Sequence, residues 1–318
     1  MKRLYIVGNG FDLYHGMKTT YYNFKSYLRE HRSPVYESVE KYIGYDYEDE
    51  KSSVWNKFEE NLKNLEEDTI IEECRVYLIG YGDDEWSDSA HHDFQYCIDS
   101  IKNNLTSGLL DNFTDWIKNE NFKLNQIDRK LLLLDDSLFL SFNYTMLLEE
   151  KYGIKSNNIL HIHNSVEGGN ELILGHNYSE AKRLQNEKSF PNIRTKSDID
   201  ELLAERGLEE DDVRYREGKN IIRSYHGENY KNSTGIIERN KDFFERLDDV
   251  ESIHVIGHSM SEVDIDYFDE ITKKVNKDVQ WNFTWHTSED KENIECFIKR
   301  ANINQYRLGF ISDYEIGE

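Results

Sequence analysis

The feature that most constrains this chain is its opening, where the apolar run Leu4–Val7 breaks into Gly8-Asn9-Gly10 and then into a helix-like segment. This order is typical of a first β-strand that feeds a phosphate-binding turn. Glycines let the backbone approach a diphosphate, and the following helix presents unpaired N–H groups and the positive end of its dipole to the anion. A nucleotide is therefore the first ligand to consider.

The turn departs from the dinucleotide fingerprint Gly-x-Gly-x-x-Gly, which is followed about 20 residues later by an acidic residue at the end of a second strand. Leu13 stands at the third glycine position, and Glu30, the carboxylate at the right distance, lies in a helix-like stretch. The sequence is therefore not that of a standard dehydrogenase. The alternative interpretation is that Gly8 and Gly10 only turn a tight corner below a buried strand.

The composition limits the partners and the location. The 318 residues carry 39 Lys and Arg against 62 Asp and Glu, a net charge of −23, which argues against a general basic surface and against direct nucleic-acid binding. The three cysteines, Cys74, Cys97 and Cys296, show no Cys-x-x-Cys spacing, and no apolar run approaches the ~20 residues of a transmembrane helix. We expect a cytoplasmic protein with reduced cysteines, no secretory leader and no membrane partner.

Alternating strand-like and helix-like segments predict the fold class. The strand-like runs are Leu4–Val7, Ser137–Phe142, Ile159–His163, Glu171–Leu174, Ser252–Ile256 and Val279–Trp285. The helix-like segments are Phe11–Glu30, Tyr144–Tyr152, Asp264–Val275 and Ser288–Ala301. This alternation predicts an α/β fold with a doubly wound, mostly parallel, Rossmann-like sheet.

Two polar segments interrupt the alternation. Residues 33–134 are acidic, aromatic and mostly helical in pattern, and residues 179–234 are polar and highly charged. We expect residues 1–32 and 135–318 to form a nucleotide-binding core. Residues 33–134 would be a helical insertion within it, and residues 179–234 a second, mostly helical polar insertion.

Polar residues follow several expected strands, and ligands of parallel sheets collect beyond the carboxyl ends of the strands. Asn143 is one of these residues, and its amide can both donate to and accept from a ribose hydroxyl, or hold a water molecule. The alternative is that Asn143 caps the helix expected over Tyr144–Tyr152.

His161 and His163 are expected to lie on the same face of a strand. Two histidines so placed can share a metal ion, but no third ligand stands at a recognisable spacing, so no metal is predicted. A neutral imidazole at a strand end is suited to take a proton from a sugar hydroxyl or from water near pH 7. The alternative is a hydrogen-bonded core histidine.

The segment Gly257-His258-Ser259 follows another strand and imitates the Gly-x-Ser-x-Gly nucleophile elbow of α/β-hydrolases. The fifth position, however, is Ser261, and His286 is the only histidine further along the chain. A serine hydrolase is one interpretation. The other is a second small-residue turn whose backbone and hydroxyl touch the far part of a dinucleotide, with Asp264 capping the next helix.

The residues at these strand ends belong to a series of short sequence motifs, which occur in order along most of the chain. They are Ile6-Val7-Gly8-Asn9-Gly10-Phe11-Asp12-Leu13-Tyr14-His15-Gly16, Ser141-Phe142-Asn143-Tyr144-Thr145 with Glu149, Ile159–Asn164, Gly175-His176-Asn177 and Ile256-Gly257-His258-Ser259-Met260-Ser261-x-x-Asp264. Taken together, these motifs resemble those of the bacterial AbiH family. The resemblance implies a role in abortive infection, in which an infected cell halts or dies before phage spreads.

The same motifs resemble those of a divergent sirtuin-like NAD-binding fold. That resemblance implies Asn143 and His163 as the catalytic pair, with Asn164 where sirtuin-like sequences have a glycine. The chain has no four-cysteine zinc module of the kind found in deacylase sirtuins, which argues against deacetylation. The cofactor-binding residues it implies are Gly8, Asn9, Gly10, Phe11, Asp12, Gly257, His258, Ser259 and Asp264.

The resemblance implies an anti-phage NAD hydrolase that cleaves the nicotinamide–ribose bond. The alternative is a non-catalytic sensor of NAD, ADP-ribose or a related nucleotide, or a regulatory subunit of a defence system. An enzyme that drains NAD must be held inactive in a healthy cell. We therefore expect control through a homo-oligomer or a partner protein of the defence system.

Overall fold

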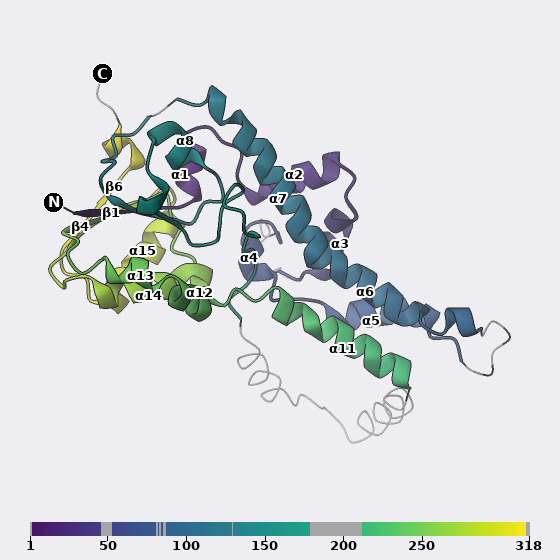
Figure 1. The fold of residues 1–318 in the computed structure, drawn as a ribbon. Helices are drawn as coiled ribbons and strands as arrows, with labels where there is room; N and C mark the ends of the chain where they lie inside the picture. The colour runs from purple at the N-terminus through teal and green to yellow at the C-terminus, as the bar shows by residue number, and fades with distance from the viewer. Residues whose placement is uncertain are drawn as a thin grey trace. The chain divides into compact units, whose positions relative to one another are not determined.

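The computed structural model describes residues 2–45, 53–80, 82, 84, 87–128, 130–178 and 212–315 (Figure 1). The chain divides into two compact units. Unit 1 comprises Met1–Tyr27, Asn112–Asn177 and Lys231–Glu318, and unit 2 comprises Leu28–Asp111 and Tyr178–Tyr230. The first part of the second expected insertion, residues 179–211, lies outside the described residues.

Unit 1 is built on one sheet of six parallel strands, in the order β3-β2-β1-β4-β5-β6. The strands are β1 (Arg3–Val7), β2 (Leu138–Ser141), β3 (Ile159–His161), β4 (Ser252–Ile256), β5 (Gln280–Thr284) and β6 (Tyr306–Gly309). Parallel pairing requires a long crossover between successive strands. The expected α/β class and the parallel sheet are confirmed.

The strand prediction is wrong at two places. Residues Glu171–Leu174 form no strand, and the amide of Ile173 instead donates a single bond to the carbonyl of His163 at 3.0 Å. The edge strand Tyr306–Gly309 was not predicted, because its side chains are exposed or half-exposed and give no apolar run. Edge strands face water on one side, so their sequence signal is weak.

The apolar signal of β1 comes from burial on both faces of the sheet. Leu4 and Ile6 belong to one core cluster, which also contains apolar residues of β4 and β5 and of α12 to α15. Tyr5 and Val7 belong to the cluster on the opposite face, together with residues of α1 and α8. Successive strand side chains point to opposite faces, so a strand covered on both sides reads as a continuous apolar run.

Helices occur in both units. They are α1 (Asn9–Tyr14), α2 (Tyr21–Glu30), α3 (Pro34–Tyr42), α4 (Phe58–Asn61), α5 (Glu67–Cys74), α6 (Asp93–Leu105), α7 (Ser107–Asn121), α8 (Leu147–Tyr152), α11 (Val213–Glu228), α12 (Ser233–Arg239), α13 (Lys241–Glu245), α14 (Ile265–Lys274) and α15 (Ser288–Ala301). Short 3₁₀ segments are η1 (Arg75–Tyr77), η2 (Asp88–Ala90), η3 (Phe122–Gln126), η4 (Ser156–Asn158), η5 (Glu262–Asp264) and η6 (Ile311–Tyr314). No helix in the described ranges combines the length and the apolar composition needed to cross a bilayer.

The helix expected over Phe11–Glu30 is two helices, α1 and α2. Gly16 adopts a φ of +87°, a conformation that ends a right-handed helix. The loop that follows is held by Asn9, whose Nδ2 donates to the carbonyl of Thr19 at 3.0 Å and whose Oδ1 accepts from the Thr19 hydroxyl at 2.6 Å. The predicted helices at 264–275 and 288–301 correspond to α14 and α15.

Unit 2 contains a pair of packed helices, α6 and α11. Gly218 of α11 makes this close approach possible, because a Cβ there would lie 2.5 Å from a ring carbon of Phe94 and 2.8 Å from Cδ1 of Ile98. A disulfide joins Cys74 to Cys97, whereas Cys296 in unit 1 is free and exposed. The expectation of reduced cysteines is therefore wrong for this pair, whose sequence spacing gives no hint of the spatial contact between α5 and α6.

The turn after β1 lies directly against the turn after β4. Gly8 N–H donates to the carbonyl of Ile256 at 3.0 Å, and Gly10 N–H donates to the carbonyl of Gly257 at 2.8 Å. A Cβ at Gly8 or Gly10 would lie 2.7 Å from Gly257 backbone atoms, and one at Gly257 would lie 2.4 Å from Phe11 N. The two backbones can approach this closely only because these positions are glycines.

Gly257→Ala is expected to destabilise unit 1 strongly. Gly257 has a φ of +65°, and its new methyl would also overlap Phe11 N. Gly153→Ala is the matched control, since Gly153 has a φ of +66° with nothing within 4 Å, and it should cost only the ~1–2 kcal/mol of a left-handed residue. Thermal unfolding should show a loss of more than ~3 kcal/mol for Gly257→Ala. Equal losses in both variants would contradict the backbone contact.

Candidate functional site

A buried carboxylate network lies at the carboxyl ends of β1 and β2. Asp12, in α1 just after β1, is only 2% exposed. Its Oδ1 accepts from Nδ2 of Asn143 at 2.8 Å, and its Oδ2 accepts from the Thr145 hydroxyl at 2.8 Å. Asn143 follows β2, and its backbone N–H is held by the Ser141 hydroxyl at 3.2 Å. The structure therefore brings together Asp12 and Asn143 from positions far apart in the sequence.

Asn143 is not a helix cap. The helix after β2 begins at Leu147, three residues later than expected, and Met146 occupies the position before it without a side-chain capping bond. The amide of Asn143 is used instead by Asp12. The interpretation of Asn143 as a helix cap is therefore wrong. The Asn143 side chain belongs instead to the cluster around Asp12 at the carboxyl ends of β1 and β2.

The environment of Asp12 changes its acidity. Burial raises the pKa of the Asp12 carboxyl to about 7, while the hydrogen bonds from Thr145 and Asn143 oppose this rise. A carboxyl of this kind is partly protonated at neutral pH, so it can either hold or accept a proton there. The sequence shows Asp12 only as an acidic residue early in a helix, and nothing in it indicates this burial.

A second cluster surrounds Asp264, at the end of η5. Its Oδ1 lies 3.4 Å from Nε2 of His163 and 3.6 Å from Nζ of Lys231, and its Oδ2 lies 3.5 Å from Nε2 of His258. Lys231 is only 1% exposed. Asp264 precedes α14 but makes no side-chain capping bond, so its carboxylate serves this cluster and not the helix.

The hydrogen bonds of His258 and His163 differ, and those of His258 indicate which ring nitrogen carries its proton. Nδ1 of His258 accepts from the N–H of Met260 at 2.9 Å, which places the ring proton on Nε2, facing Asp264. His163 has a hydrogen bond with the Phe142 backbone, and neither its Nε2 nor Oδ1 of Asp264 has a hydrogen-bond partner among the described residues.

Buried charges in this cluster set the acidity of its members. Burial, and then the positive charge of Lys231, lower the pKa of the His163 ring to about 3, so the ring is neutral and a weak base, although the Asp264 carboxylate opposes this lowering. Burial opposes ionisation of Asp264, but Lys231 and the two histidines lower the pKa of its carboxyl well below the usual range. Lys231 belongs to none of the sequence motifs, and only the tertiary structure identifies it.

His161 and His163 do not share a face. The ring of His161 lies 3.1 Å from the carbonyl of Asn143 and 2.9 Å from Oε1 of Glu149, whereas His163 faces Asp264. β3 ends at His161, and the amide of Asn164 closes a turn onto the His161 carbonyl at 3.1 Å, so strand alternation no longer applies. The same-face expectation is therefore wrong. Among the described residues no group of three or more His, Cys, Asp or Glu is arranged to hold a metal ion.

The remaining predicted residues lie around the two turns. Phe11 is buried in the core, while Asn9 and Ser259 are exposed. In the described part of the chain the Ser259 hydroxyl makes no hydrogen bond to a histidine, and Nδ1 of His258 is engaged by Met260. Met260 has a φ of +57°, so this turn contains a left-handed residue that is not glycine. The geometry does not resemble a serine–histidine nucleophile pair.

The fold and the site define an α/β protein with two buried polar clusters at the carboxyl edge of a parallel sheet. Residues 4–285 match the family described as bacteriophage abortive infection AbiH. The chain belongs to this family of phage abortive-infection defence proteins. No curated protein and no solved structure matches the chain.

Asp12→Asn is expected to make stability less dependent on pH. The fold raises the pKa of Asp12 from its ordinary 3.8 to about 7, so the native protein binds this proton more tightly than the unfolded chain. The resulting stabilisation is full below pH 3.8 and is lost as pH rises towards 7, by about 4 kcal/mol. Melting temperatures should therefore favour Asp12→Asn over the wild type increasingly between about pH 5 and about pH 8. A constant difference would contradict the raised pKa.

Lys231→Met is expected to destabilise unit 1 by about 3–5 kcal/mol, because it leaves Asp264 as a buried charge without its cation. In the double variant Lys231→Met/Asp264→Asn no buried charge remains, so the loss should be smaller than in Lys231→Met alone. Asp264→Asn completes the double-mutant cycle, measured by thermal unfolding. Strictly additive losses would contradict the coupling of the two charges.

Proposed function

We propose that this protein is an NAD hydrolase that cleaves the nicotinamide–ribose bond during abortive infection. The observation that carries the proposal is the Asp12–Asn143 pair at the carboxyl ends of the central strands β1 and β2. His163 follows the neighbouring strand β3, and its neutral ring is the proposed proton acceptor, with the Asp264 carboxylate 3.4 Å from Nε2 to stabilise the imidazolium that forms. Ligands of parallel sheets bind at this edge, and these residue types suit proton transfer and the positioning of a sugar or water.

The strand order supports a dinucleotide ligand. The order β3-β2-β1-β4-β5-β6 is that of doubly wound Rossmann sheets, in which the ligand binds where the order reverses, here between β1 and β4. The sirtuin-like part of the proposal is supported by Asn164, which has a φ of +63°. This left-handed conformation is one that glycine adopts freely and asparagine tolerates better than most residues. The backbone at Asn164 is therefore one that a glycine would also adopt, which is compatible with the sirtuin-like resemblance.

The reaction assigns a task to each side chain. Nδ2 of Asn143 donates to Asp12, which leaves the amide oxygen to accept from a water molecule or a ribose hydroxyl. As the C1′–N bond breaks, its electron pair passes to the pyridinium nitrogen, and neutral nicotinamide leaves. The water oxygen bonds to C1′, and the water proton passes to Nε2 of His163, giving ADP-ribose. The proton transfer is worth ~10²–10⁴-fold in rate.

The rest of the dinucleotide would lie over the two turns, with the diphosphate at Gly8, Asn9 and Gly10 and the adenosine near Gly257 and Ser259. Asn9 and Ser259 are the exposed members of this set. The N–H groups of Gly8 and Gly10 already donate to backbone carbonyls. The Asn9 side chain is also engaged, by Thr19. A diphosphate would therefore rely on the outer face of the turn, or exchange with these internal bonds.

A nucleotide sensor is the second candidate, and the burial of the site favours it. Asn143 and His163 are almost fully buried, and Asn143 donates its amide to Asp12. A site whose polar groups already hydrogen-bond to one another can bind a nucleotide at its rim without hydrolysing it. The same burial also suits an enzyme that is held inactive until an oligomer or a defence-system partner opens it.

The test is release of nicotinamide from NAD by the purified protein, with and without phage lysate, which supplies an infection signal. Asn143→Ala and His163→Ala should each lower the rate by at least ~10²-fold. Asn157→Ala, at an exposed position in η4, is the control and should leave the rate unchanged. Melting temperatures of all variants separate loss of chemistry from loss of folding.

No nicotinamide release under either condition, together with an NAD-dependent rise in melting temperature, would reject the hydrolase and favour the sensor. Release that persists in both site variants would place the chemistry elsewhere.

A further inference from the structure

His161, the last residue of β3, lies between two acceptors. One ring nitrogen, Nδ1, is 3.1 Å from the backbone carbonyl oxygen of Asn143, and the other, Nε2, is 2.9 Å from Oε1 of Glu149 in α8. The side chains of His161 and Glu149 are only 11% and 14% exposed. Neither of these two residues has a task in the reaction proposed above.

The two contacts indicate where the protons of the pair lie. A carbonyl oxygen can only accept, so Nδ1 of His161 donates to Asn143. Nε2 then either donates to an ionised Glu149 or accepts from a protonated one. An imidazole binds a proton more tightly than a carboxylate does, and the 2.9 Å separation is that of a charge-assisted bond. The contacts therefore favour an imidazolium at His161 beside an ionised Glu149.

Asn143 connects this pair to Asp12. The backbone carbonyl of Asn143 accepts from His161, while its side-chain Nδ2 donates to Oδ1 of Asp12 at 2.8 Å. Burial raises the pKa of the Asp12 carboxyl, and among the described residues His161 is the one charged side chain that opposes this rise. Within ion-pair distance of the His161 ring, the described part of the chain places Glu149 alone. His161 thus acts on the site both through Asn143 and through its charge.

We propose that His161, held by Glu149, is a positioning residue that anchors Asn143 and maintains a positive charge acting on Asp12. The anchored backbone keeps the Asn143 amide on the Asp12 carboxyl. The positive charge favours the ionised form of Asp12, so this carboxyl releases its proton at a lower pH than burial alone would allow. The catalytic benefit of this arrangement rests on the proposed hydrolase function, whereas the anchoring and the charge can be measured without it.

Glu149→Gln tests the charge while keeping the contact. A glutamine amide can donate to Nε2 of His161, so the ring loses its extra proton but retains both hydrogen bonds. In protein labelled with ¹⁵N-histidine, the ring nitrogens of His161 should show the imidazolium state near neutral pH in the wild type and the neutral state in the variant. In protein labelled with carboxyl-¹³C aspartate, the midpoint of the Asp12 titration should move to higher pH in the variant.

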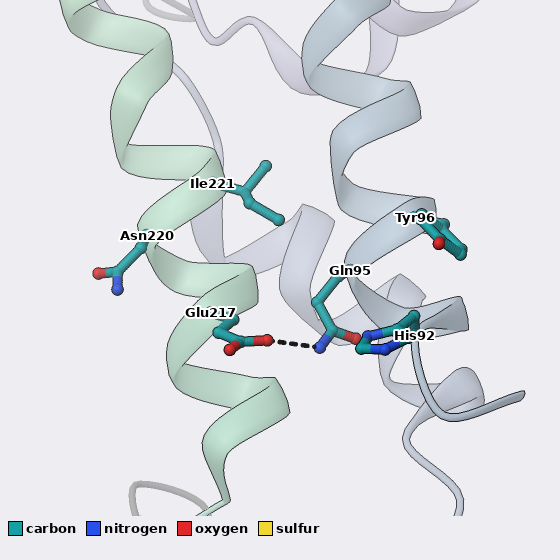
Figure 2. Close-up of a pocket in the computed structure, with 6 residues that line it drawn as sticks. All are labelled: His92, Gln95, Tyr96, Glu217, Asn220 and Ile221. Carbon is teal, nitrogen blue, oxygen red and sulfur yellow. Dashed lines mark hydrogen bonds between the residues drawn. The ribbon is translucent and has the colours of Figure 1, made fainter. Parts of the chain in front are cut away.

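Two glutamates of unit 2 provide matched controls. Glu67 lies 3.0 Å from Nε2 of His226, so Glu67→Gln makes the same change in another glutamate–histidine pair. Glu217 on α11 instead accepts from the neutral amide of Gln95 on α6 at 3.0 Å (Figure 2), so Glu217→Gln removes a negative charge with no histidine involved. Both controls should titrate like the wild type, since no charged side chain among the described residues of unit 2 affects the acidity of Asp12.

Two variants of His161 separate the anchoring from the charge. His161→Asn keeps a donor close to the position of Nδ1, and His161→Leu keeps an apolar side chain of similar size without a donor. Both should move the Asp12 midpoint to higher pH. The side-chain amide protons of Asn143 should stay protected from solvent exchange in His161→Asn and exchange faster in His161→Leu. Loss of the His161 signals in these variants also assigns them in the wild-type spectrum.

Three results would overturn the proposal. They are a neutral His161 ring in the wild type, an Asp12 midpoint that stays unchanged or moves to lower pH in Glu149→Gln, and equal exchange of the Asn143 amide in His161→Asn and His161→Leu. Melting temperatures verify that each variant is folded. None of these readouts involves NAD, so a failure of this proposal is distinguishable from a failure of the proposed hydrolase.

Discussion

The contact between the turns that follow β1 and β4 is the constraint on which unit 1 depends. Two backbone hydrogen bonds, from Gly8 to Ile256 and from Gly10 to Gly257, join the carboxyl ends of the two strands. This contact sets the start of α1, and α1 carries Asp12. It also sets the turn that carries His258 towards Asp264. The glycines therefore have a structural role in this fold whatever ligand the turns bind.

The two buried carboxylates of the sheet edge are stabilised in opposite ways. Asp12 has neutral partners, Asn143 and Thr145, so burial dominates and raises its pKa to about 7. Asp264 has the buried cation Lys231 beside it, so it stays ionised despite burial. Pairs of titratable groups whose pKa values are pushed apart are typical of sites that move protons. One edge of the sheet thus holds a group that can exchange a proton near neutral pH and a group with a fixed charge.

The sequence predicts the elements that local patterns determine. The apolar runs of β1, β2, β4 and β5 and the helices α14 and α15 follow from burial and periodicity, and the motif strings identify the family. The edge strand β6 was missed because its side chains are exposed. The contacts between the site residues were missed for another reason. The hydrogen bond between Asp12 and Asn143 joins residues that are 131 positions apart, and Lys231, which pairs with Asp264, lies in no motif. Such contacts depend on tertiary packing, which residue spacing does not encode.

The position of β1 has a consequence for synthesis of the chain. β1 is made first, but one of its neighbours in the sheet begins at Leu138 and the other at Ser252. Pairing over such sequence distances is slow, and it cannot finish before the later strand leaves the ribosome. A chain interrupted before residue 252 carries Asp12, Asn143 and His163 but lacks His258 and Asp264. The complete strand-end site therefore exists only in nearly full-length protein, so prematurely ended chains carry an incomplete site into the cell.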